Sequence, residues 1–278
     1  MMILNQFKRR KTMPNNSVKP KVVILAGGIG MRLREETEYK PKPMVLIGHR
    51  PILWHIMKIY MHHGFNDFIV CLGYKGEMIK EYFLNYETLN NDFTVRYDGI
   101  SKITPLKNST SDSFSVTLVD TGLETRTGGR IKMIEKYIDS DDFLLTYGDG
   151  VGDVNIKDLF ERHMMHGKTG TVTGVHPESR FGELIINGDR VSAFSEKPQV
   201  KEGFISGGFF AFKKNFFKYL KAFDDSFFEQ EPMRKLVQDD QLNVFKHEGF
   251  WACMDTFKDV KYLNDLWEQG KAPWKVWK

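Results

Sequence analysis

The chain has only two cysteines among 278 residues, and no apolar run reaches the roughly 20 residues that a membrane-spanning helix needs. Cys71 and Cys253 each lie in an apolar, strand-like stretch. We therefore expect two buried free thiols in a reducing compartment, rather than a disulfide or a metal pair. No apolar segment accompanies the basic residues near the N-terminus, so a secretory signal and a membrane partner are not expected. No period of 20–50 residues repeats, which excludes a solenoid.

Over most of its length, the chain has no large excess of positive or negative charge. The net charge is +4, but residues 1–21 hold six Lys and Arg and no Asp or Glu, so the remainder is slightly acidic. The basic residues are therefore typical of a solvated tail rather than of a nucleic-acid-binding face. We predict a disordered basic tail over residues 1–19 and no nucleic-acid partner.

What the chain does have is ordinary globular composition, with 41% hydrophobic and 27% charged residues. Short apolar runs alternate with segments of helical period. Strands are predicted at residues 22–28, 67–74, 93–97, 115–121, 142–150 and 169–175. Helices are predicted at residues 51–64, 76–86, 128–138 and 155–167. This alternation predicts an α/β protein with three layers, in which helices cover both faces of a mostly parallel, Rossmann-like sheet.

Two further segments interrupt the alternation. Residues 101–113 are polar and rich in turn residues, so we expect a mobile insertion there. In residues 181–198, the sequence "NGD" stands between two β-rich runs and predicts a hairpin.

The first strand ends in a glycine turn that is typical of phosphate binding. Gly27, Gly28 and Gly30 lack Cβ atoms, so the backbone N–H groups of the turn can approach an anion closely. Arg32 adds a fixed positive fork, and Lys42 adds a point charge between two prolines. Together they indicate a polyphosphate, although a plain tight turn, a dinucleotide site or an S-adenosylmethionine site would also use such glycines. The spacing lacks the third glycine of GxGxxG, and no G-K-[ST] follows as a Walker motif requires.

The stretch "LAGGIGMRL", followed by "KPKPMVLIG" and "PILWHIMKIY", resembles the signature of the sugar-1-phosphate nucleotidylyltransferases. The more similar branch is the glucose-1-phosphate cytidylyltransferases. The resemblance covers residues 21–278 and continues through "GYKGEMIKEYFLNY", "VTLVDTG", "TGGRIK", "TYGDGV", "FGEL", "SEKP", "GGFF", "MDT" and "LWEQGKAPWK". It implies the nucleotide-diphospho-sugar transferase fold, with one domain over residues 20–278. That domain would have a nucleotide-binding half at about 20–155 and a small β-rich, sugar-binding and C-terminal portion at about 156–278.

The resemblance implies transfer of a cytidylyl group from CTP to α-D-glucose 1-phosphate, with Mg²⁺ as cofactor. It also implies a cytoplasmic homo-oligomer that supplies CDP-sugars for the deoxysugars of bacterial surface polysaccharide. Two alternatives stay open. The enzyme could use UTP, dTTP or another sugar or polyol phosphate, or the chain could be a catalytically silent, nucleotide-binding regulatory subunit. A binding module for S-adenosylmethionine or a dinucleotide is more distant.

The resemblance assigns the chemistry to three residues, Arg32, Lys42 and Asp149. The implied nucleotide-binding residues are Leu25, Ala26, Gly27, Gly28, Ile29, Gly30, Met31, Arg32, Lys42, Thr125, Arg130 and Asp149. Met31 stands where the family usually has Thr or Ser, so a phosphate-facing hydroxyl is missing.

Two aspartates are the implied metal ligands. Asp149 ends a buried strand between two glycines, where a turn residue is the alternative. Asp255 precedes Thr256, where a helix N-cap is the alternative. Carboxylate oxygens suit Mg²⁺, and the resemblance assigns the metal to these two residues.

The implied sugar-phosphate residues are Gly182, Glu196, Lys197 and Ser206. Lys197 would bind the phosphate and Glu196 the sugar hydroxyls, with a surface ion pair as the alternative role. Ser206 replaces the asparagine of the family's "NGG", which leaves the identity of the sugar less certain than the reaction class.

Two patterns invite other interpretations. His163 and His166 have the spacing of neighbours on a helix but no third ligand, so we expect an exposed helix face rather than a metal site. The tryptophan-rich end, residues 267–277, could pack on the body of the protein or meet another subunit.

Overall fold

The fold is described from a computed structural model, which describes residues 19–98, 101–106, 112–177, 183–187, 190–195, 203–221 and 226–278. The predicted tail therefore lies outside the described residues except for Lys19. Within these ranges no helix is both long and apolar enough to cross a membrane.

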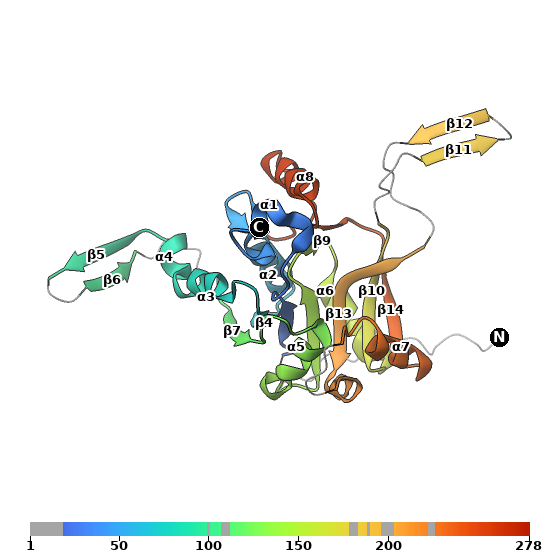
Figure 1. Ribbon diagram of the computed structural model, residues 1–278, viewed down its shortest axis with the longest axis horizontal. Coiled ribbons are helices and arrows are strands. Elements are labelled where there is room, and N and C mark those ends of the chain that lie inside the picture. Colours follow the sequence, from blue (N-terminus) through green and yellow to red (C-terminus); the bar gives the residue numbers. More distant parts are fainter. Residues whose placement is uncertain are drawn as a thin grey trace, which may run out of the picture.

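A seven-stranded sheet forms the centre of the molecule (Figure 1). In order across the sheet, its strands are β14 (Leu242–His247), β10 (Gly170–Val175), β13 (Ile205–Lys213), β8 (Asp142–Tyr147), β1 (Val22–Leu25), β4 (Asp67–Leu72) and β7 (Ser115–Asp120). β8, β1, β4 and β7 are mutually parallel, as is the β10–β14 pair. Only β13 runs against both of its neighbours. The predicted mostly parallel sheet is confirmed.

Strand β1 shows why a continuous apolar run forms a central strand. Val22 and Ile24 belong to the core on one face of the sheet, whereas Val23 and Leu25 belong to the core on the other face. Successive side chains of a strand point to opposite faces, so a strand that is covered on both sides has no polar position. The backbone of β1 pairs with β4 and β8 at every residue, which fixes the end of the strand inside the sheet.

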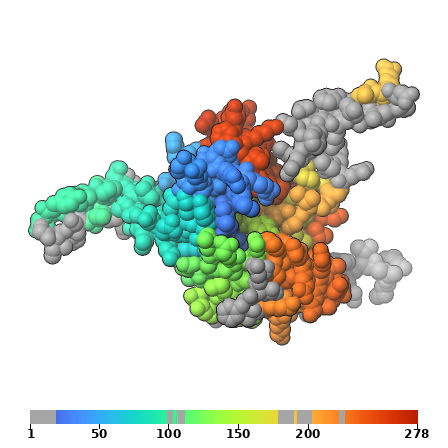
Figure 2. All heavy atoms as spheres, viewed as in Figure 1, coloured from blue at the N-terminus to red at the C-terminus, as the bar shows by residue number. Residues whose placement is uncertain are grey.

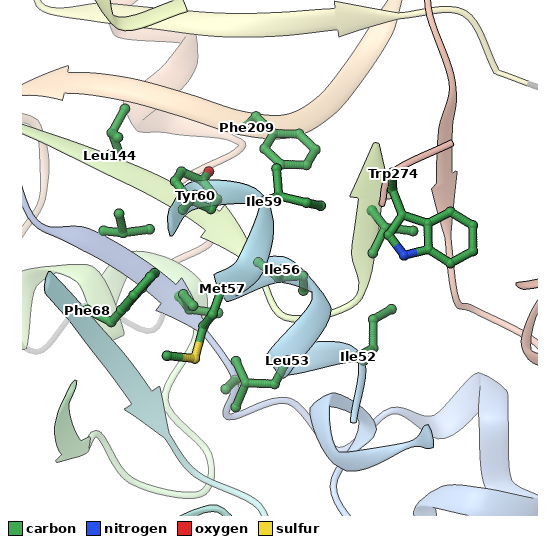
Figure 3. Packing of buried hydrophobic residues seen from close by; sticks show 14 of the residues in the cluster. Ile52, Leu53, Ile56, Met57, Ile59, Tyr60, Phe68, Leu144, Phe209 and Trp274 are labelled. Carbon is green, nitrogen blue, oxygen red and sulfur yellow. The ribbon is translucent and has the colours of Figure 1, made fainter. Parts of the chain in front are cut away.

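Helices cover both faces, which confirms the three-layer prediction. One core contains residues from α2 (Ile52–His62), α6 (Ile156–His166) and α8 (Phe257–Glu268). The other contains residues from α5 (Thr127–Met133), η4 (Lys214–Tyr219) and α7 (Glu231–Gln238). Figure 3 shows apolar side chains of α2 packed toward the sheet, where the ring of Tyr60 stacks on Phe209 with 6.1 Å between centroids.

Short elements connect these layers. The helical turns and short helices are η1 (Met31–Leu33), α1 (Arg34–Thr37), η2 (Lys42–Met44), α3 (Gly76–Leu84), α4 (Tyr86–Asn90) and η3 (Glu135–Tyr137). Two small antiparallel pairs complete the body, namely β2 (Leu46–Ile47) with β3 (Arg50–Pro51) and β9 (Gly150–Gly152) with β15 (Trp251–Cys253).

Two hairpins stand away from the body on opposite sides (Figure 1). The predicted hairpin is confirmed, because β11 (Glu183–Asn187) pairs antiparallel with β12 (Arg190–Ser195). The other hairpin consists of β5 (Phe93–Tyr97) and β6 (Ser101–Pro105), and Figure 2 shows it as a narrow arm. The mobile insertion expected at residues 101–113 contains β6, which pairs antiparallel with β5, and its mobility stays a prediction. Residues 107–111 lie outside the described residues.

The tryptophan-rich C-terminal segment packs on the body of its own chain. Trp274 is fully buried and stacks on Phe250, with 5.6 Å between ring centroids. Its indole N–H donates to Nδ1 of His55 at 3.4 Å, while Nε2 of His55 lies 3.0 Å from the carbonyl of Ile47. The tryptophan-rich segment therefore packs on the body of the protein, which was the first of its two expected roles.

The prediction of an exposed histidine face on α6 is wrong. His163 is fully buried, and its ring nitrogens lie 2.8 Å from Oγ1 of Thr171 and 3.2 Å from Oδ1 of Asp142. His163 thereby joins the helix to β10 and β8. Cys71 and Cys253 are both free, as predicted; Cys71 is fully buried, whereas Cys253 is only half-buried, so the prediction of burial is confirmed for Cys71 alone.

Candidate active site

A cleft opens where β1 and β8 end at the same edge of the sheet. It has a volume of about 370 Å³, which is within the usual range for small-molecule sites. Its lining comes from the turn after β1, from η2, from the segment that leads into α5, from the end of β8 and from Phe227. The lining residues are Leu25–Arg32, Lys42, Pro43, Leu123–Thr127, Arg130, Tyr147, Gly148, Asp149 and Phe227. All the nucleotide-binding residues predicted from the sequence are among them.

The glycine turn has the geometry that its sequence predicts. Gly30 has φ of +70°, and a Cβ there would lie 2.8 Å from the methyl group of Thr37, so this position requires glycine. A Cβ on Gly28 would meet nothing within 4 Å, which shows that this part of the backbone faces open space at the cleft. Met31, at the position of the missing hydroxyl, is 70% exposed.

Four charged side chains meet at the end of β8. The ammonium nitrogen of Lys42 lies 2.7 Å from Oδ2 of Asp149 and 2.6 Å from Oδ1 of Asp255. Arg32 reaches the other carboxylate oxygen of Asp255 at 2.9 Å. Residues that are far apart in sequence thus form one cluster, as the resemblance requires. We call Arg32, Lys42, Asp149 and Asp255 the charged cluster.

Within the charged cluster, Lys42 and Asp255 hold each other in their ionised forms. Burial alone would lower the pKa of Lys42, but Asp149 and Asp255 outweigh burial and raise it above its ordinary value. Burial alone would raise the pKa of Asp255, but Lys42 and then Arg32 outweigh burial and hold it below its ordinary value. At neutral pH the site therefore presents two cations and, at Asp255, a carboxylate.

Prolines and a glycine place Lys42 against the end of β8. Pro41 precedes η2 in an extended conformation, and its carbonyl accepts the N–H of Met44 at 2.8 Å. A Cβ on Gly148 would lie 2.9 Å from Cγ of Pro43, so η2 packs directly on the residue before Asp149. The lysine between two prolines is thus held in place by the backbone on which it stands.

Asp255 does not cap helix α8. Thr256 is the N-cap, and the carboxylate of Asp259 accepts the backbone N–H groups of Thr256 at 2.7 Å and of Asp255 at 3.0 Å. The carboxylate of Asp255 is therefore available to the charged cluster. The N–H of Met254 donates to the carbonyl of Asp149 at 2.8 Å, so β15 and the end of β8 are joined directly.

Arg130 lines the cleft but is anchored within the protein. Nη1 donates to the carbonyls of Leu72 and Gly122 and to the hydroxyl of Thr121, at 2.7–2.9 Å. Nη2 donates to the carbonyls of Gly27 and Leu123, each at 3.1 Å. A Cβ on Gly27 would overlap the guanidinium. Arg130 therefore joins the glycine turn to the loop after β7, an arrangement that only long-range contacts could reveal.

Of the four predicted sugar-phosphate residues, the structure describes only Ser206. Gly182, Glu196 and Lys197 lie outside the described residues, and their roles stay predictions. Ser206 is exposed on β13 opposite Gly174, and it is not among the cleft-lining residues named above. Two residues after Ser206 on the same strand, Gly208 has a positive φ of +77°.

Sequence reasoning missed part of the cleft wall. Tyr147, Thr127 and Phe227 all line it, and Arg126 lies over the ring of Phe227 at 5.1 Å from its centroid. Tyr147 was foreseeable, because it ends β8 two residues before Asp149, which lies in the bend after the strand. Phe227 comes from a distant part of the chain and carried no local signal.

Residues 21–272 match the family Nucleotidyl transferase, and the chain belongs to this family. Within it, the chain is 48% identical to the glucose-1-phosphate cytidylyltransferase of Salmonella typhimurium, over 92% of this chain and 99% of the relative. It is 44% identical to a probable glucose-1-phosphate cytidylyltransferase of Bacillus subtilis, over 92% of this chain and all of the relative.

Two solved structures share the fold. HddC from Yersinia pseudotuberculosis aligns with a TM-score of 0.64 and 23% identity, over 90% of this chain and all of that one. A putative glucose-1-phosphate thymidylyltransferase from Bacillus anthracis aligns with a TM-score of 0.65 and 18% identity, over 94% of this chain and 98% of that one. At these identities the likeness concerns the fold alone, and it agrees with the predicted nucleotide-diphospho-sugar transferase fold.

Proposed function

We propose that this protein transfers the cytidylyl group of CTP to α-D-glucose 1-phosphate, giving CDP-glucose and pyrophosphate. The observation that carries the proposal is the charged cluster, which places two cations and two carboxylates at the mouth of a glycine turn. The proposed substrates follow from the names of relatives that are 48% and 44% identical over nearly their whole length.

In the proposed reaction, a phosphate oxygen of glucose 1-phosphate attacks the α-phosphorus of CTP. A new P–O bond forms as the bond to the β-phosphate breaks, and pyrophosphate leaves with its electron pair. Both reactants are anions, so the site must offset charge and hold the attack in line. Arg32 and Lys42 are assigned to the triphosphate, where their charges would stabilise the departing pyrophosphate.

Magnesium is the proposed cofactor, and Asp149 and Asp255 are its proposed ligands. The donor set fits, because both carboxylates already converge on a single cationic group, the ammonium of Lys42. Mg²⁺ takes one or two carboxylates and completes its shell with water and substrate phosphates. Bound there, the ion would neutralise charge on the triphosphate.

The remaining assignments are part of the same proposal. The turn from Leu25 to Met31, together with Thr125, would hold the nucleotide, with Arg130 beneath it. Gly182, Glu196, Lys197 and Ser206 would hold the sugar phosphate. We also infer a cytoplasmic homo-oligomer in a pathway that makes deoxysugars of surface polysaccharide, an inference that rests on the resemblance to cytidylyltransferases alone.

The test is pyrophosphate release from CTP, UTP and dTTP, each with glucose 1-phosphate and with a panel of other sugar and polyol phosphates. We expect the highest kcat/KM for CTP with glucose 1-phosphate, and CDP-glucose as the product identified by mass. A higher kcat/KM for another pair would replace the proposed substrates. No pyrophosphate release with any pair would favour a silent nucleotide-binding subunit.

A further inference from the structure

Glu229 joins two residues of the cleft wall without lining the cleft itself. The hydroxyl of Tyr147 donates to Oε1 of Glu229 at 2.7 Å, and the hydroxyl of Thr127 donates to Oε2 at 2.6 Å. Both donors line the cleft, whereas Glu229 is not among its lining residues. The hydrogen bonds of Glu229 thus reach the cleft through Tyr147 and Thr127. We call these three residues the Glu229 clamp.

One side of the clamp is the segment that is assigned to the nucleotide. Thr127 begins α5, two residues after Thr125, and its hydroxyl also accepts the N–H of Phe228 at 3.1 Å. The N–H of Gly128 donates to the carbonyl of Ser226 at 3.0 Å. A Cβ on Gly128 would lie 2.8 Å from that carbonyl oxygen, so the two segments are in close contact. The segment that carries Glu229 is thus docked on the start of α5.

The other side of the clamp lies close to a proposed metal ligand and to the strand of a proposed sugar residue. Tyr147 ends β8, two residues before Asp149. Its ring packs against the backbone of Gly208, where a Cβ would lie 2.6 Å from Cδ2 of the ring. Gly208 is on β13, two residues after Ser206. The ring of Tyr147 therefore packs on β13 next to the proposed sugar residue, at the edge of the pairing between β13 and β8.

The contacts restrain the ring of Tyr147 from several directions. Its neighbours include Phe210 and Phe228, with ring centroids 5.9 and 6.1 Å away. The hydroxyl is fixed by its hydrogen bond to Oε1 of Glu229 at 2.7 Å. The ring is packed against its neighbours and hydrogen-bonded at its hydroxyl, so its position is fixed. β13 packs against the ring in that position.

We infer that Glu229 is a positioning residue for cytidylyl transfer, which sets β13 and its sugar phosphate relative to Asp149 and the bound nucleotide by holding Tyr147 and Thr127 together. The inference rests on the proposed function. In-line attack requires the reacting atoms about 3–3.5 Å apart, and a displacement of about 1 Å can cost on the order of a hundredfold in rate. The clamp connects all three parts of the site that must meet this requirement.

The test is a double-mutant cycle of Tyr147→Phe and Glu229→Ala, with kcat, both KM values and calorimetric CTP binding measured for each variant. We expect each single variant to lower kcat about tenfold or more while the Kd for CTP changes less than twofold. The double variant should be no slower than the slower single variant, because residues that act as one unit are not additive. Glu229→Gln keeps an acceptor for the Tyr147 hydroxyl and should recover most of the lost kcat.

Tyr219→Phe is the matched control, because the hydroxyl of Tyr219 donates to Asp239 at 3.0 Å in an equivalent tyrosine–carboxylate pair outside the cleft. It should keep the wild-type kcat. Multiplicative losses in the double variant, a kcat at the wild-type level, or a matching loss of CTP affinity would each overturn the inference. If Glu229→Ala does not fold, the same cycle is run with Glu229→Met, which keeps the length of the side chain and removes its hydrogen-bond acceptors. An inactive wild-type protein in the same assay would instead contradict the proposed function.

Discussion

At the scale of single residues, the site depends on charged side chains that contact and neutralise one another. Lys42 contacts both carboxylates of the charged cluster, and its own pKa is raised by them. A lysine and two aspartates at this distance would be costly to bury separately, and they persist because each offsets the charge of the others. Substituting one member therefore changes both the charge of the site and the position of its partners.

We predict that Asp149→Asn lowers kcat about a hundredfold or more, in line with the loss of a charged group that acts directly on the reacting phosphates. The substitution keeps the shape of the side chain and removes its charge. Asp240→Asn is the control, because Asp240 pairs with Lys168 at 2.6 Å on the surface. Turnover in EDTA equal to that in Mg²⁺, or equal loss in the two variants, would contradict the metal assignment.

At the scale of elements, the C-terminal segment is fixed to α2 through a neutral histidine. Burial lowers the pKa of His55 to about 4, because the ring is surrounded by aromatic side chains and has only the carbonyl of Ile47 and the indole of Trp274 as polar partners. Nε2 can donate to the carbonyl while Nδ1 accepts from the indole, an arrangement that suits the uncharged ring. Protonation would leave the second nitrogen facing another donor.

The folded pKa of His55 is below its unfolded value, so the unfolded state binds the extra proton between about pH 6.5 and pH 4. We predict that the free energy of unfolding of the wild type, relative to His55→Gln, falls by about 3 kcal/mol as pH drops through this range. Denaturant unfolding at several pH values measures it. His62→Gln, at the exposed end of the same helix, should follow the wild-type profile. Parallel profiles for wild type and His55→Gln would show that His55 is not held neutral.

The sequence predicted elements better than it predicted the contacts between them. The glycine turn and the Asp149 strand end are local patterns, because a buried strand and its turn are specified by adjacent residues. The burial of His163 and the anchoring of Arg130 depend on partners from other elements, such as Thr171 and the carbonyl of Gly27. The Glu229 clamp likewise joins residues 82 and 102 positions apart. No periodicity in a single segment carries that information.

At the scale of the whole molecule, the described core accounts for the fold without the basic N-terminal residues. The core residues begin at Val22, and β1 is already paired on both sides from that residue. The ammonium of Lys19 contacts the carbonyl of Gly64 at 3.3 Å, on the surface. A basic segment without a long apolar run is not expected to bury much surface.

We predict that deleting residues 1–18 changes kcat by less than twofold and leaves the Tm nearly unchanged. Both are measured on the purified truncated chain next to the full-length protein, and sedimentation compares their oligomeric states. A truncated chain that fails to fold, or that changes its oligomeric state, would show that the domain boundary at residue 20 is wrong.

The central claim is that the α-phosphate of CTP moves to glucose 1-phosphate in this cleft. Incubating the protein with Mg²⁺, glucose 1-phosphate and CTP labelled at the α-phosphorus tests it in one measurement. The account predicts that the label appears in CDP-glucose, that the pyrophosphate is unlabelled, and that omitting the sugar phosphate stops the transfer. Label that stays in CTP, or that appears in CMP without regard to glucose 1-phosphate, would contradict it.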